Sequence, residues 1–584
     1  MDKTTGGGEK ATQKGADANL VERFISGLPL FAQVSSEARS AIVGRLSAQL
    51  VRAGEVVLRE GDVGDSLFIV QSGRLRVTVG EPERVIGELG KGEVVGEMAL
   101  LSDEPRSATV LAVRDSTLLR LESADFTELV ADHPGVLRAV SSVIVDRLRS
   151  SITGVPKTQS TADVVAVISA ASPGDSSQLA EHLSSTFESM GEQVAVLRAG
   201  SGVELDRVEE ECDVVLLICG DHDDPWTLKS VRQADVILLV GPGGQSTAMK
   251  RTEEALGIGD GWTGADVQLV FTHTAGSNPR STRRVLSALE KRRHHHVCIA
   301  EVESLARLAR ALRGRAIVLV LGGGGARGLA HLGVVKAFAD KGVGIDGIVA
   351  TSAGTLVGMG VSLGMDLADI HEGFREYFSK SVVDWTFPSV SVAAGSRITG
   401  ELQKLGDGHD LEDTWIDFSC VSTDLTNDEL VLHTTGPIWE AVRASISIPG
   451  VFPPFLKDGR VLVDGGLADN VPVASARRRH PGATIVAVDV GRDTRLEPKD
   501  LPAGGIVGAK HGLTRLRHRG DKLGLSAILA RVTELSTTYD INEAADIGIR
   551  PDIGHFGTFE FDRIDEACDL GYEAAMTSLK DFDY

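Results

Sequence analysis

The hydrophobic and polar positions divide the chain into stretches with different periods. A helical pattern from about residue 20 to residue 50 precedes short alternating segments separated by glycines, and a second helical pattern covers residues 123–151. Alternation with glycine turns at this density predicts a small β-barrel or jelly roll. The alternating segments, which we expect to be strands, are residues 55–59, 66–71, 75–79, 84–88 and 109–121.

Farther along, runs typical of buried strands alternate with helical patterns, which predicts two successive α/β layers. In the first layer we expect a helix at residues 176–190 and strands at residues 164–169, 193–197, 214–219, 236–240 and 267–271. The second layer begins near residue 315. There we expect helices at residues 327–340 and 355–363, and strands at residues 316–321, 345–350, 418–423, 461–463 and 485–490.

These patterns predict a multidomain chain, and 584 residues are too many for one hydrophobic core. Residues 1–19 are polar and glycine-rich, which is typical of a disordered segment. We expect residues 20–152 to form a barrel or jelly-roll domain that also contains helices, followed by a linker at 153–162 and an α/β middle domain at 163–312. The last expected part is an α/β domain at 315–584, which has its core at 316–490 and ends in a C-terminal extension.

Composition limits the classes of partner and the compartment. A formal net charge of −22 argues against nucleic acid or general affinity for anionic membranes. Residues 510–531 are locally basic, and either peripheral docking on lipid or a solvated helix face would explain them. Five scattered cysteines without CxxC spacing favour a reducing cytoplasm. No secretory signal or membrane-spanning run is evident, so we expect a cytoplasmic protein, with the inner membrane face as a peripheral alternative.

Two features suggest ligands but lack the rest of a binding signature. Residues 172–177 lie where a phosphate-binding loop would be, yet they lack its Gly-Lys-Ser/Thr sequence, so a structural spacer is favoured over an ATP site. The histidines at 294–296 would point in different directions on a helix and have no acidic partners nearby in the sequence. We therefore expect no metal site there.

Residues 96–109 form a motif suited to a cyclic phosphate. Gly96 precedes a short helix whose N–H groups can bind phosphate, and Glu97 can hydrogen-bond a ribose hydroxyl. Arg106, nine residues later, can pair with the phosphate through two parallel bonds. The motif resembles the cassette of cyclic-nucleotide-binding domains in protein kinase regulatory subunits and bacterial transcription regulators. That resemblance implies a cAMP or cGMP pocket formed by Gly96, Glu97, Met98, Ala99, Arg106, Ser107 and Ala108.

Ser352 carries the sharpest chemical signal in the chain. It stands between small residues, after a strand and before a helix, which is the context of a tight nucleophile elbow. A helix N-terminus at that point favours developing negative charge. The first glycine of the usual G-x-S-x-G pattern is replaced by Ala350, and an alanine with positive φ would strain the elbow by about 1–2 kcal/mol.

Asp464 is the candidate base. A serine hydroxyl is a weak nucleophile and needs a base within hydrogen-bond reach. Asp464 follows the expected strand at 461–463 and precedes two glycines, so it stands at a strand end beside a flexible turn. A histidine triad is the rival arrangement. Its candidates, none of which has a supporting local motif, are His480, His511, His518 and His555.

A glycine-rich loop at residues 322–328 follows one strand and opens a helix. Its backbone N–H groups can face an oxyanion, and Arg327 adds positive charge near them. A dinucleotide-binding fold uses the same device but needs an acidic residue at the end of its second strand. Here the second strand ends in the serine elbow instead, which disfavours that alternative.

These motifs together resemble the patatin-like phospholipases, as do residues 443–454 and 465–472, and the resemblance covers about 316–490. It implies a Ser–Asp dyad in which Ser352 attacks an ester carbonyl of a phospholipid or lysophospholipid and Asp464 takes its proton. Water then hydrolyses the acyl-enzyme, with no metal and no catalytic cofactor. The implied oxyanion group is Gly323, Gly324, Gly325 and Arg327, and the remaining motif glycines are Gly328, Gly354, Gly465 and Gly466.

Residues 224–227 and 232–240 extend the resemblance toward the N-terminus. They look like the segment ahead of the esterase domain in the neuropathy target esterase family, whose members also place cyclic-nucleotide-like domains before a patatin domain. The leading hypothesis is a serine lipid esterase regulated by cyclic nucleotide. The alternatives are a nucleotide-responsive scaffold with a catalytically dead esterase fold, acyl transfer to an alcohol, and, for assembly, a homodimer paired through the helices of the nucleotide module.

Overall fold

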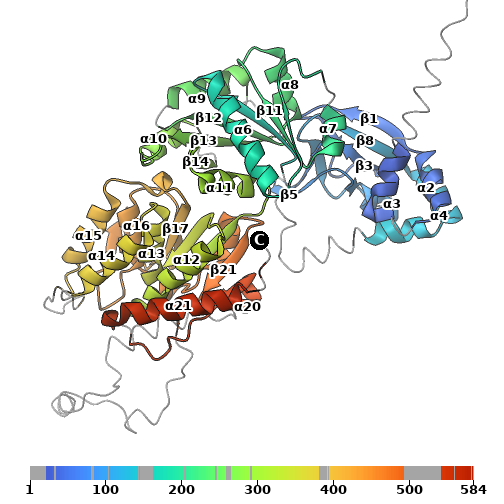
Figure 1. Cartoon of the computed structure of the whole chain (residues 1–584). Coiled ribbons are helices and arrows are strands. Elements are labelled where there is room, and N and C mark those ends of the chain that lie inside the picture. Colours follow the sequence, from blue (N-terminus) through green and yellow to red (C-terminus); the bar gives the residue numbers. More distant parts are fainter. Residues whose placement is uncertain are drawn as a thin grey trace, which may run out of the picture. The chain divides into compact units, whose positions relative to one another are not determined.

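The computed structural model describes residues 21–31, 34–80, 84–102, 104–142, 144, 162–202, 205–243, 246–257, 265–289, 293–379, 384, 391, 393–491, 541–557, 560–580 and 582. The chain forms two compact units. The first comprises Met1–Thr272, Lys291–His295 and Leu312–Gly314, and the second comprises His273–Glu290, His296–Ala311 and Arg315–Tyr584. Figure 1 colours the chain along its sequence.

The first unit begins with an all-β domain built as a sandwich of two four-stranded sheets, β1-β8-β3-β6 and β2-β7-β4-β5, which confirms the expected fold. Two boundaries differ from the predictions. The first helical stretch ends at Val43 and a strand follows, and the expected strand at 109–121 is two strands. The elements are η1 Pro29–Phe31, α2 Ser36–Val43, β1 Ser47–Val51, β2 Val56–Leu58, β3 Ser66–Ser72, β4 Leu75–Val79, β5 Arg84–Leu89, β6 Val94–Val95, α3 Glu97–Ser102, β7 Thr109–Ala112, β8 Ser116–Glu122 and α4 Ser123–Asp132.

Strand β3 is buried on both of its faces. Its side chains alternate between two cores, because successive residues of a strand point to opposite faces. Leu67 and Ile69 join the cluster under the helices, whereas Phe68 and Val70 join the cluster between the sheets. Both faces are therefore buried, and the strand reads as an uninterrupted apolar run.

A six-stranded sheet with order β10-β11-β9-β12-β13-β14 follows, and helices cover it, as expected for the middle domain. The histidines at 294–296 lie on strand β14 and not on a helix, which corrects the prediction. The elements are β9 Val164–Ser169, α6 Pro173–Ser189, β10 Val194–Leu197, α7 Leu205–Glu211, β11 Val214–Ile218, α8 Pro225–Gln233, β12 Val236–Pro242, α9 Ser246–Leu256, β13 Asp266–His273, α10 Thr282–Ala288, β14 His294–Cys298 and α11 Val302–Leu312.

The second unit holds an eight-stranded sheet with order β19-β20-β17-β16-β15-β21-β22, and β18 pairs with β17. Its strands are β15 Ile317–Leu321, β16 Gly347–Thr351, β17 Asp417–Asp424, β18 Glu429–His433, β19 Phe455–Lys457, β20 Arg460–Asp464, β21 Thr484–Val488 and β22 Ile547–Ile549. Its helices are η3 Gly325–Leu329, α12 Ala330–Lys341, α13 Ala353–Ser362, α14 Leu367–Ser379, α15 Ser396–Gly406, η4 Leu411–Asp413, α16 Ile438–Ser445, η5 Gly465–Leu467, α17 Val473–Arg479, α20 Ile541–Ala544, η8 Phe561–Arg563 and α21 Ile564–Ser578.

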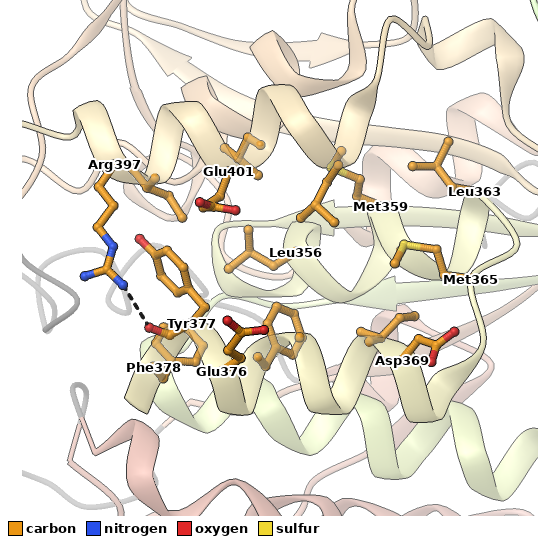
Figure 2. Close-up of a pocket in the computed structure, with 17 residues that line it drawn as sticks. Leu356, Met359, Leu363, Met365, Asp369, Glu376, Tyr377, Phe378, Arg397 and Glu401 are labelled. Atoms are coloured by element: carbon orange, nitrogen blue, oxygen red, sulfur yellow. Dashed lines mark hydrogen bonds between the residues drawn. The ribbon is translucent and has the colours of Figure 1, made fainter. Parts of the chain in front are cut away.

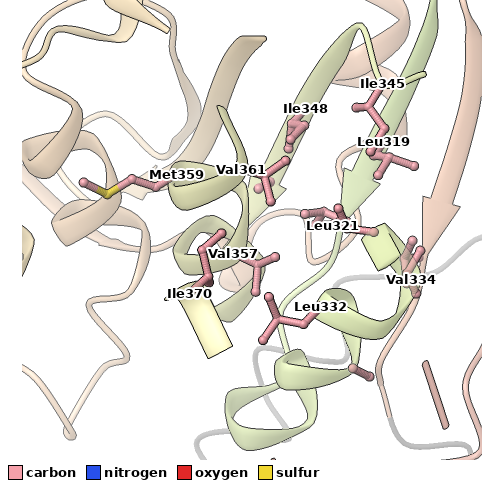
Figure 3. Packing of buried hydrophobic residues seen from close by; sticks show 14 of the residues in the cluster. Leu319, Leu321, Leu332, Val334, Ile345, Ile348, Val357, Met359, Val361 and Ile370 are labelled. Atoms are coloured by element: carbon pink, nitrogen blue, oxygen red, sulfur yellow. The ribbon is translucent and has the colours of Figure 1, made fainter. Parts of the chain in front are cut away.

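Strand β17 connects the two halves of this sheet. It pairs in parallel with β16, where Thr351 lies beside Val421, and antiparallel with β20, where Ser422 lies beside Asp464. Consecutive residues of β17 thus carry the end of β16 and the end of β20 to the same edge. In the core beneath, Val357 and Val361 of α13 pack with Leu321 and Ile348 of the two central strands (Figure 3).

Several sequence predictions lie outside the described residues. These are the disordered segment at 1–19, all but the last residue of the linker at 153–162, and the basic segment at 510–531. In the part of the chain that the structure does describe, every helix is too short or too polar to cross a lipid bilayer.

Candidate active site and nucleotide pocket

Ser352 occupies a strained turn between β16 and α13. Its backbone angles are φ 50° and ψ −122°, and a non-glycine residue with positive φ costs free energy that the surrounding structure must supply. Such a turn is typical of a nucleophile elbow. Ala350, by contrast, lies inside β16 and is not among the residues with positive φ. The strain that we expected at Ala350 therefore falls on the serine itself.

The side chains of Ser352 and Asp464 form a direct hydrogen bond. Ser352 Oγ donates to Asp464 Oδ2 at 2.6 Å, and the backbone N–H of Gly466 donates to the other carboxylate oxygen, Oδ1, at 2.8 Å. The carboxylate is buried. Burial raises the pKa of Asp464 to about 6, while the hydrogen bonds from Ser352 and Gly466 act to lower it. A carboxylate with this pKa can hold or release a proton near neutral pH.

Histidine does not enter this pair among the residues that the structure describes. His480 lies 3.6 Å from Asp417, and His555 lies 3.6 Å from Glu566. The other two candidates, His511 and His518, lie outside the described residues. Within the described ranges, the geometry thus favours the serine–aspartate pair over a triad.

The glycine-rich loop lies against the serine. A Cβ added to Gly323 would come within 3.0 Å of Ser352 Cβ and within 2.6 Å of Asn470 Oδ1. The Gly323 N–H, however, donates to the carbonyl of Asn470 at 3.2 Å, so it does not face an oxyanion. This corrects the expectation for Gly323, whose part is to let the loop approach the serine.

Other N–H groups near the serine remain available. In the described part of the chain, the N–H groups of Gly324 and Gly325 have no hydrogen-bond partner. The same holds, among those residues, for the N–H of Ala353, which follows the serine at the start of α13. The residue after a nucleophile commonly supplies one oxyanion donor, a signal in the sequence that we did not use.

Arg327 is placed differently from the prediction. Its side chain is fully buried, Nε donates to the carbonyl of Val490 at 2.9 Å, and Nη1 donates to that of Phe556 at 3.4 Å. The guanidinium therefore ties the glycine-rich loop to the end of the sheet and to the C-terminal segment. These two carbonyls, and not an oxyanion, accept the hydrogen bonds that Nε and Nη1 donate.

The remaining motif glycines are positions of close approach. A Cβ on Gly328 would overlap Ala353, a Cβ on Gly354 would overlap the backbone of Leu321, and a Cβ on Gly465 would overlap that of Val421. Gly466 donates its N–H to Asp464. Gly328, Gly354 and Gly465 thus let neighbouring residues approach closely, whereas Gly466 binds the carboxylate itself.

Two serines that the sequence patterns did not indicate hold the backbone of this pair. Ser445, at the end of α16, accepts the N–H of Ser352 on its Oγ at 3.0 Å. The carbonyl of Ser447 accepts the N–H of Asp464 at 2.9 Å. Both serines belong to the segment at 443–454, which resembles the family pattern, but the spacing of that segment alone does not indicate which atoms contact the site.

His331 and Asn470 form hydrogen bonds to carbonyl groups of the glycine-rich loop. The side-chain amide of Asn470 donates to the carbonyl of Gly323 at 3.1 Å, and His331 Nε2 lies 2.8 Å from the carbonyl of Gly322. Burial lowers the pKa of His331 to about 4, although the bond to Gly322 opposes this. The imidazole is therefore neutral at physiological pH and donates through Nε2.

The expected nucleotide residues are brought together in the first unit. Gly96 has a φ of 86°, and Glu97 begins α3. Arg106 is 4% exposed, and its guanidinium donates to the carbonyls of Gly96 at 2.9 Å and Ser66 at 2.7 Å. Glu97 is likewise buried. These bonds hold the Arg106 side chain beside the N-terminus of α3.

The other pocket residues lie around this centre. Ala99 is buried and packs closely on Gly64, whereas Met98 is 47% exposed. Ser107 is exposed, with its Oγ 3.9 Å from Met98 Sδ, and Ala108 is half-buried. Met98 and Ser107 are thus exposed beside Arg106, whereas Ala99 and Ala108 are partly or fully buried.

Comparison with known proteins identifies three domains in the chain. The model for patatin-like phospholipase matches residues 319–477, and the model for the cyclic nucleotide-binding domain matches residues 48–133. A third model, the neuropathy target esterase family P-loop like domain, matches residues 201–317, which begins after the loop at 172–177.

Curated relatives match nearly all of this chain. A lysophospholipase nte1 from Neosartorya fischeri is 28% identical over 665 residues, covering 94% of this chain and 43% of that protein. Patatin-like phospholipase domain-containing protein 7 from Rattus norvegicus is 28% identical over 608 residues, covering 90% and 44%. The chain thus spans less than half the length of these relatives. Among solved structures, the regulatory domain of Toxoplasma gondii PKA with cAMP is 32% identical, covers 20% of this chain and 46% of that chain, and has a TM-score of 0.19.

Proposed function

We propose that this chain, which carries a patatin-like phospholipase domain together with a cyclic nucleotide-binding domain, is a serine esterase that hydrolyses carboxylic esters of phospholipids or lysophospholipids. The observation that carries the proposal is the 2.6 Å hydrogen bond from Ser352 Oγ, on its strained elbow, to the buried carboxylate of Asp464. The names of the relatives, lysophospholipase and patatin-like phospholipase, support the substrate class.

The proposed reaction has two halves that share one base. Asp464 takes the hydroxyl proton as Ser352 Oγ attacks the ester carbonyl, and the oxyanion is stabilised by N–H groups of the glycine-rich loop and of Ala353. The tetrahedral adduct collapses, the C–O bond to the alcohol breaks, and Asp464 returns the proton to the leaving alcohol. Water then attacks the acyl-enzyme with Asp464 as base, which releases the fatty acid and restores Ser352.

A test of the function combines covalent labelling with product release. The full chain is expected to react with a fluorophosphonate probe and to release fatty acid from lysophosphatidylcholine, and Ser352→Ala is expected to do neither. Labelling that persists in Ser352→Ala would identify another nucleophile. A chain that is neither labelled nor active on lysophospholipid, phospholipid or simple esters would support the scaffold alternative. Products that contain the acyl group on an added alcohol would instead indicate transfer.

We further propose that cyclic nucleotide binds at Arg106 and Glu97 and regulates the esterase. Saturating cAMP or cGMP is expected to change the rate of fatty-acid release, because a regulatory ligand must bind two states of the protein unequally. Equal rates with cAMP, with cGMP and without nucleotide would contradict regulation, whatever the affinity.

Substituting Arg106 tests the nucleotide pocket itself. Arg106→Gln is expected to weaken cAMP or cGMP binding by about 30-fold or more, because the charged partner of the phosphate is lost. Isothermal titration of the full chain measures this. Since Arg106 also holds two backbone carbonyls, Glu97→Gln serves as a second variant that leaves those bonds intact. Arg52→Gln, at an exposed arginine of the same domain, is expected to bind as wild type. Wild-type affinity in both pocket variants would place the ligand elsewhere.

We also propose that the protein works in the cytoplasm, with peripheral binding at the inner face of the membrane as the alternative. All five cysteines are described, and each has a free thiol, which suits a reducing compartment. Fractionation of cells that express the chain measures this directly. Recovery only in an exported fraction would contradict it.

A further inference from the structure

Two residues of one short segment, 443–447, form hydrogen bonds with both members of the Ser352–Asp464 pair. Ser445 is the last residue of α16, and its Oγ accepts the N–H of Ser352 at 3.0 Å. Two residues later, the carbonyl of Ser447 accepts the N–H of Asp464 at 2.9 Å. Ser352 follows β16 and Asp464 ends β20, yet both backbones are tied to the same few residues.

Ser447 lies two residues beyond the end of α16, and Arg443 holds its side chain. The N–H of Ser447 still bonds to the carbonyl of Ala444 at 3.1 Å. Its Oγ donates to the carbonyl of Arg443 at 2.8 Å and accepts a bond from Arg443 Nη1 at 2.6 Å. One residue therefore uses both the proton of this hydroxyl and a lone pair of its oxygen. Arg443 thus holds the residue whose carbonyl bonds to Asp464.

The guanidinium of Arg443 is buried among neutral oxygens. The side chain is 4% exposed, Nε donates to Thr399 Oγ1 at 3.0 Å, and Nη2 donates to the carbonyl of Pro453 at 3.3 Å. Among the residues that the structure describes, no carboxylate lies within 4 Å of it. Burial lowers the pKa of Arg443, although the carboxylate of Asp384 opposes this. A buried charge with neutral partners costs stability, so packing alone does not account for this arginine.

We propose that Arg443 is a positioning residue of the esterase, which holds Asp464 within reach of Ser352 by way of Ser447. The inference rests on the proposed function, because it takes Ser352 and Asp464 as nucleophile and base. The guanidinium fixes the Ser447 hydroxyl, and the Ser447 carbonyl fixes the N–H of Asp464. The 2.6 Å bond between the two reacting side chains depends on where that backbone lies. Misplacement of a reacting group by about 1 Å can cost about 100-fold in rate.

Two substitutions interrupt this connection at different points. Arg443→Met keeps a long side chain and removes the guanidinium, whereas Ser447→Ala removes the hydroxyl and leaves the carbonyl that bonds to Asp464. Each is expected to lower kcat for fatty-acid release from lysophosphatidylcholine by about 10- to 100-fold and to leave KM within about twofold. The double variant is expected to lose no more than the weaker of the two single variants, because both act through one bond.

Arg397 provides the matched control. It lies on α15 and lines a cavity of about 240 Å³ between α13, α14 and α15, where its Nη2 donates to the carbonyl of Tyr377 at 3.3 Å (Figure 2). Its guanidinium carbon lies 5.0 Å from the centre of the Tyr377 ring, much as that of Arg443 lies 5.8 Å from the centre of the Phe452 ring. Arg397→Met thus removes a similar side chain from the same unit and is expected to keep the kcat of wild type.

A pH profile separates positioning from a loss of stability. Burial raises the pKa of Asp464 to about 6 and the bonds from Ser352 and Gly466 act to lower it, so a carboxyl that moves away from these donors should titrate at higher pH. In Arg443→Met and Ser447→Ala the midpoint of the kcat/KM profile is expected to rise by about one pH unit, and in Arg397→Met it should not change. A lower melting temperature with wild-type kcat and midpoint would overturn the proposal, as would additive losses in the double variant.

Hydrogen exchange tests the connection without any turnover. The amide of Asp464, which donates to Ser447, is expected to exchange about tenfold faster or more in Arg443→Met than in wild type, and at the wild-type rate in Arg397→Met. Faster exchange in a chain whose wild type hydrolyses no ester would refute the esterase, and with it the positioning role, and leave a structural link. Wild-type exchange and kcat in both Arg443→Met and Ser447→Ala would refute the role of Arg443 and leave the esterase.

Discussion

Replacing Asp464 by asparagine is expected to lower kcat/KM for hydrolysis of lysophosphatidylcholine by about 10⁴-fold, a loss comparable to removal of the aspartate from a serine protease triad. Asparagine keeps the size of the side chain but cannot accept the proton of Ser352 Oγ. In the native chain that proton is directed at Oδ2 over 2.6 Å, and no histidine among the described residues offers a second base. Steady-state assays of fatty-acid release measure the change.

Stability separates this effect from misfolding. Burial raises the pKa of Asp464 to about 6, from an ordinary value of 3.8, so the folded state holds the proton more tightly than the unfolded state. The contribution of this carboxyl to the free energy of unfolding therefore falls as pH rises from 3.8 through about 6. Asp464→Asn does not ionise, and at pH 7 it is expected to be at least as stable as wild type. A large loss of stability would show that the lost activity reflects unfolding.

The same carboxyl sets a pH dependence. Below pH about 6 the protonated fraction of Asp464 grows, and kcat/KM is expected to fall tenfold for each further pH unit. The residual activity of Asp464→Asn should lack this limb. Asp458→Asn, at an exposed aspartate in the turn before β20, is the matched control and should retain both the activity and the profile of wild type. A loss in the control equal to that in Asp464→Asn would contradict a specific base.

Replacing Asp235 by alanine is expected to destabilise the first unit by about 3–5 kcal/mol, because it leaves buried charges without a partner. Asp235 lies 2.7 Å from Arg114 Nε and 3.3 Å from Arg74 Nε, and its Oδ2 accepts the backbone N–H of Asp163 and Val164. These atoms connect the β-sandwich, which supplies both arginines, to strand β9 of the middle domain. Removal of one carboxylate therefore breaks a joint between two domains of the same unit.

Arg114 shows how strongly this network is coupled. Burial alone would lower its pKa, but the carboxylates of Asp235 and Glu209 raise the pKa above its ordinary value, so the guanidinium stays charged. Arg114 Nη1 and Nη2 each donate to one oxygen of Glu209, at 2.8 and 3.0 Å. Without Asp235, the guanidinium of Arg114 stays charged and buried, and Glu209 is its remaining ion-pair partner.

The measurement is thermal unfolding of the full chain combined with hydrogen exchange. For a unit of this size the expected shift is about 10 °C in the transition of the first unit. Faster exchange should appear at the amides of Asp163 and Val164, which lose their acceptor. The control is Glu181→Ala, which removes an exposed ion pair with Arg198 and should cost about 1 kcal/mol or less. Equal shifts in the two variants would show that the buried Asp235 contributes no more to the stability of the first unit than an exposed ion pair does.

Local patterns predicted most of the elements that hold the site. The strand, elbow and helix around Ser352 are encoded within a few residues, because small side chains permit the turn and apolar runs flank it on both sides. The same holds for Gly96, Glu97 and Arg106, which one short segment carries. Such patterns did not predict helices α14 and α15, nor the cavity that these helices form with α13.

Such patterns did not predict which hydrogen bonds the individual residues of the site form. Glycine at 323–325 and arginine at 327 were expected to act alike, yet the Gly323 N–H bonds to Asn470 and the Arg327 side chain is buried against the carbonyls of Val490 and Phe556. The partners come from chain segments far away in sequence. No local signal states which of several donors a distant carbonyl will occupy.

The sequence by itself therefore determined the domain types and the candidate site residues, because strands, turns and helices follow from side chains that are neighbours along the chain. Only the tertiary structure decided that Ser352 and Asp464, which are 112 positions apart, share a hydrogen bond. Strand β17 accomplishes this by pairing with β16 on one side and β20 on the other. Such pairing depends on the packing of the whole sheet, since long-range contacts offset their loop entropy only when the complete core forms.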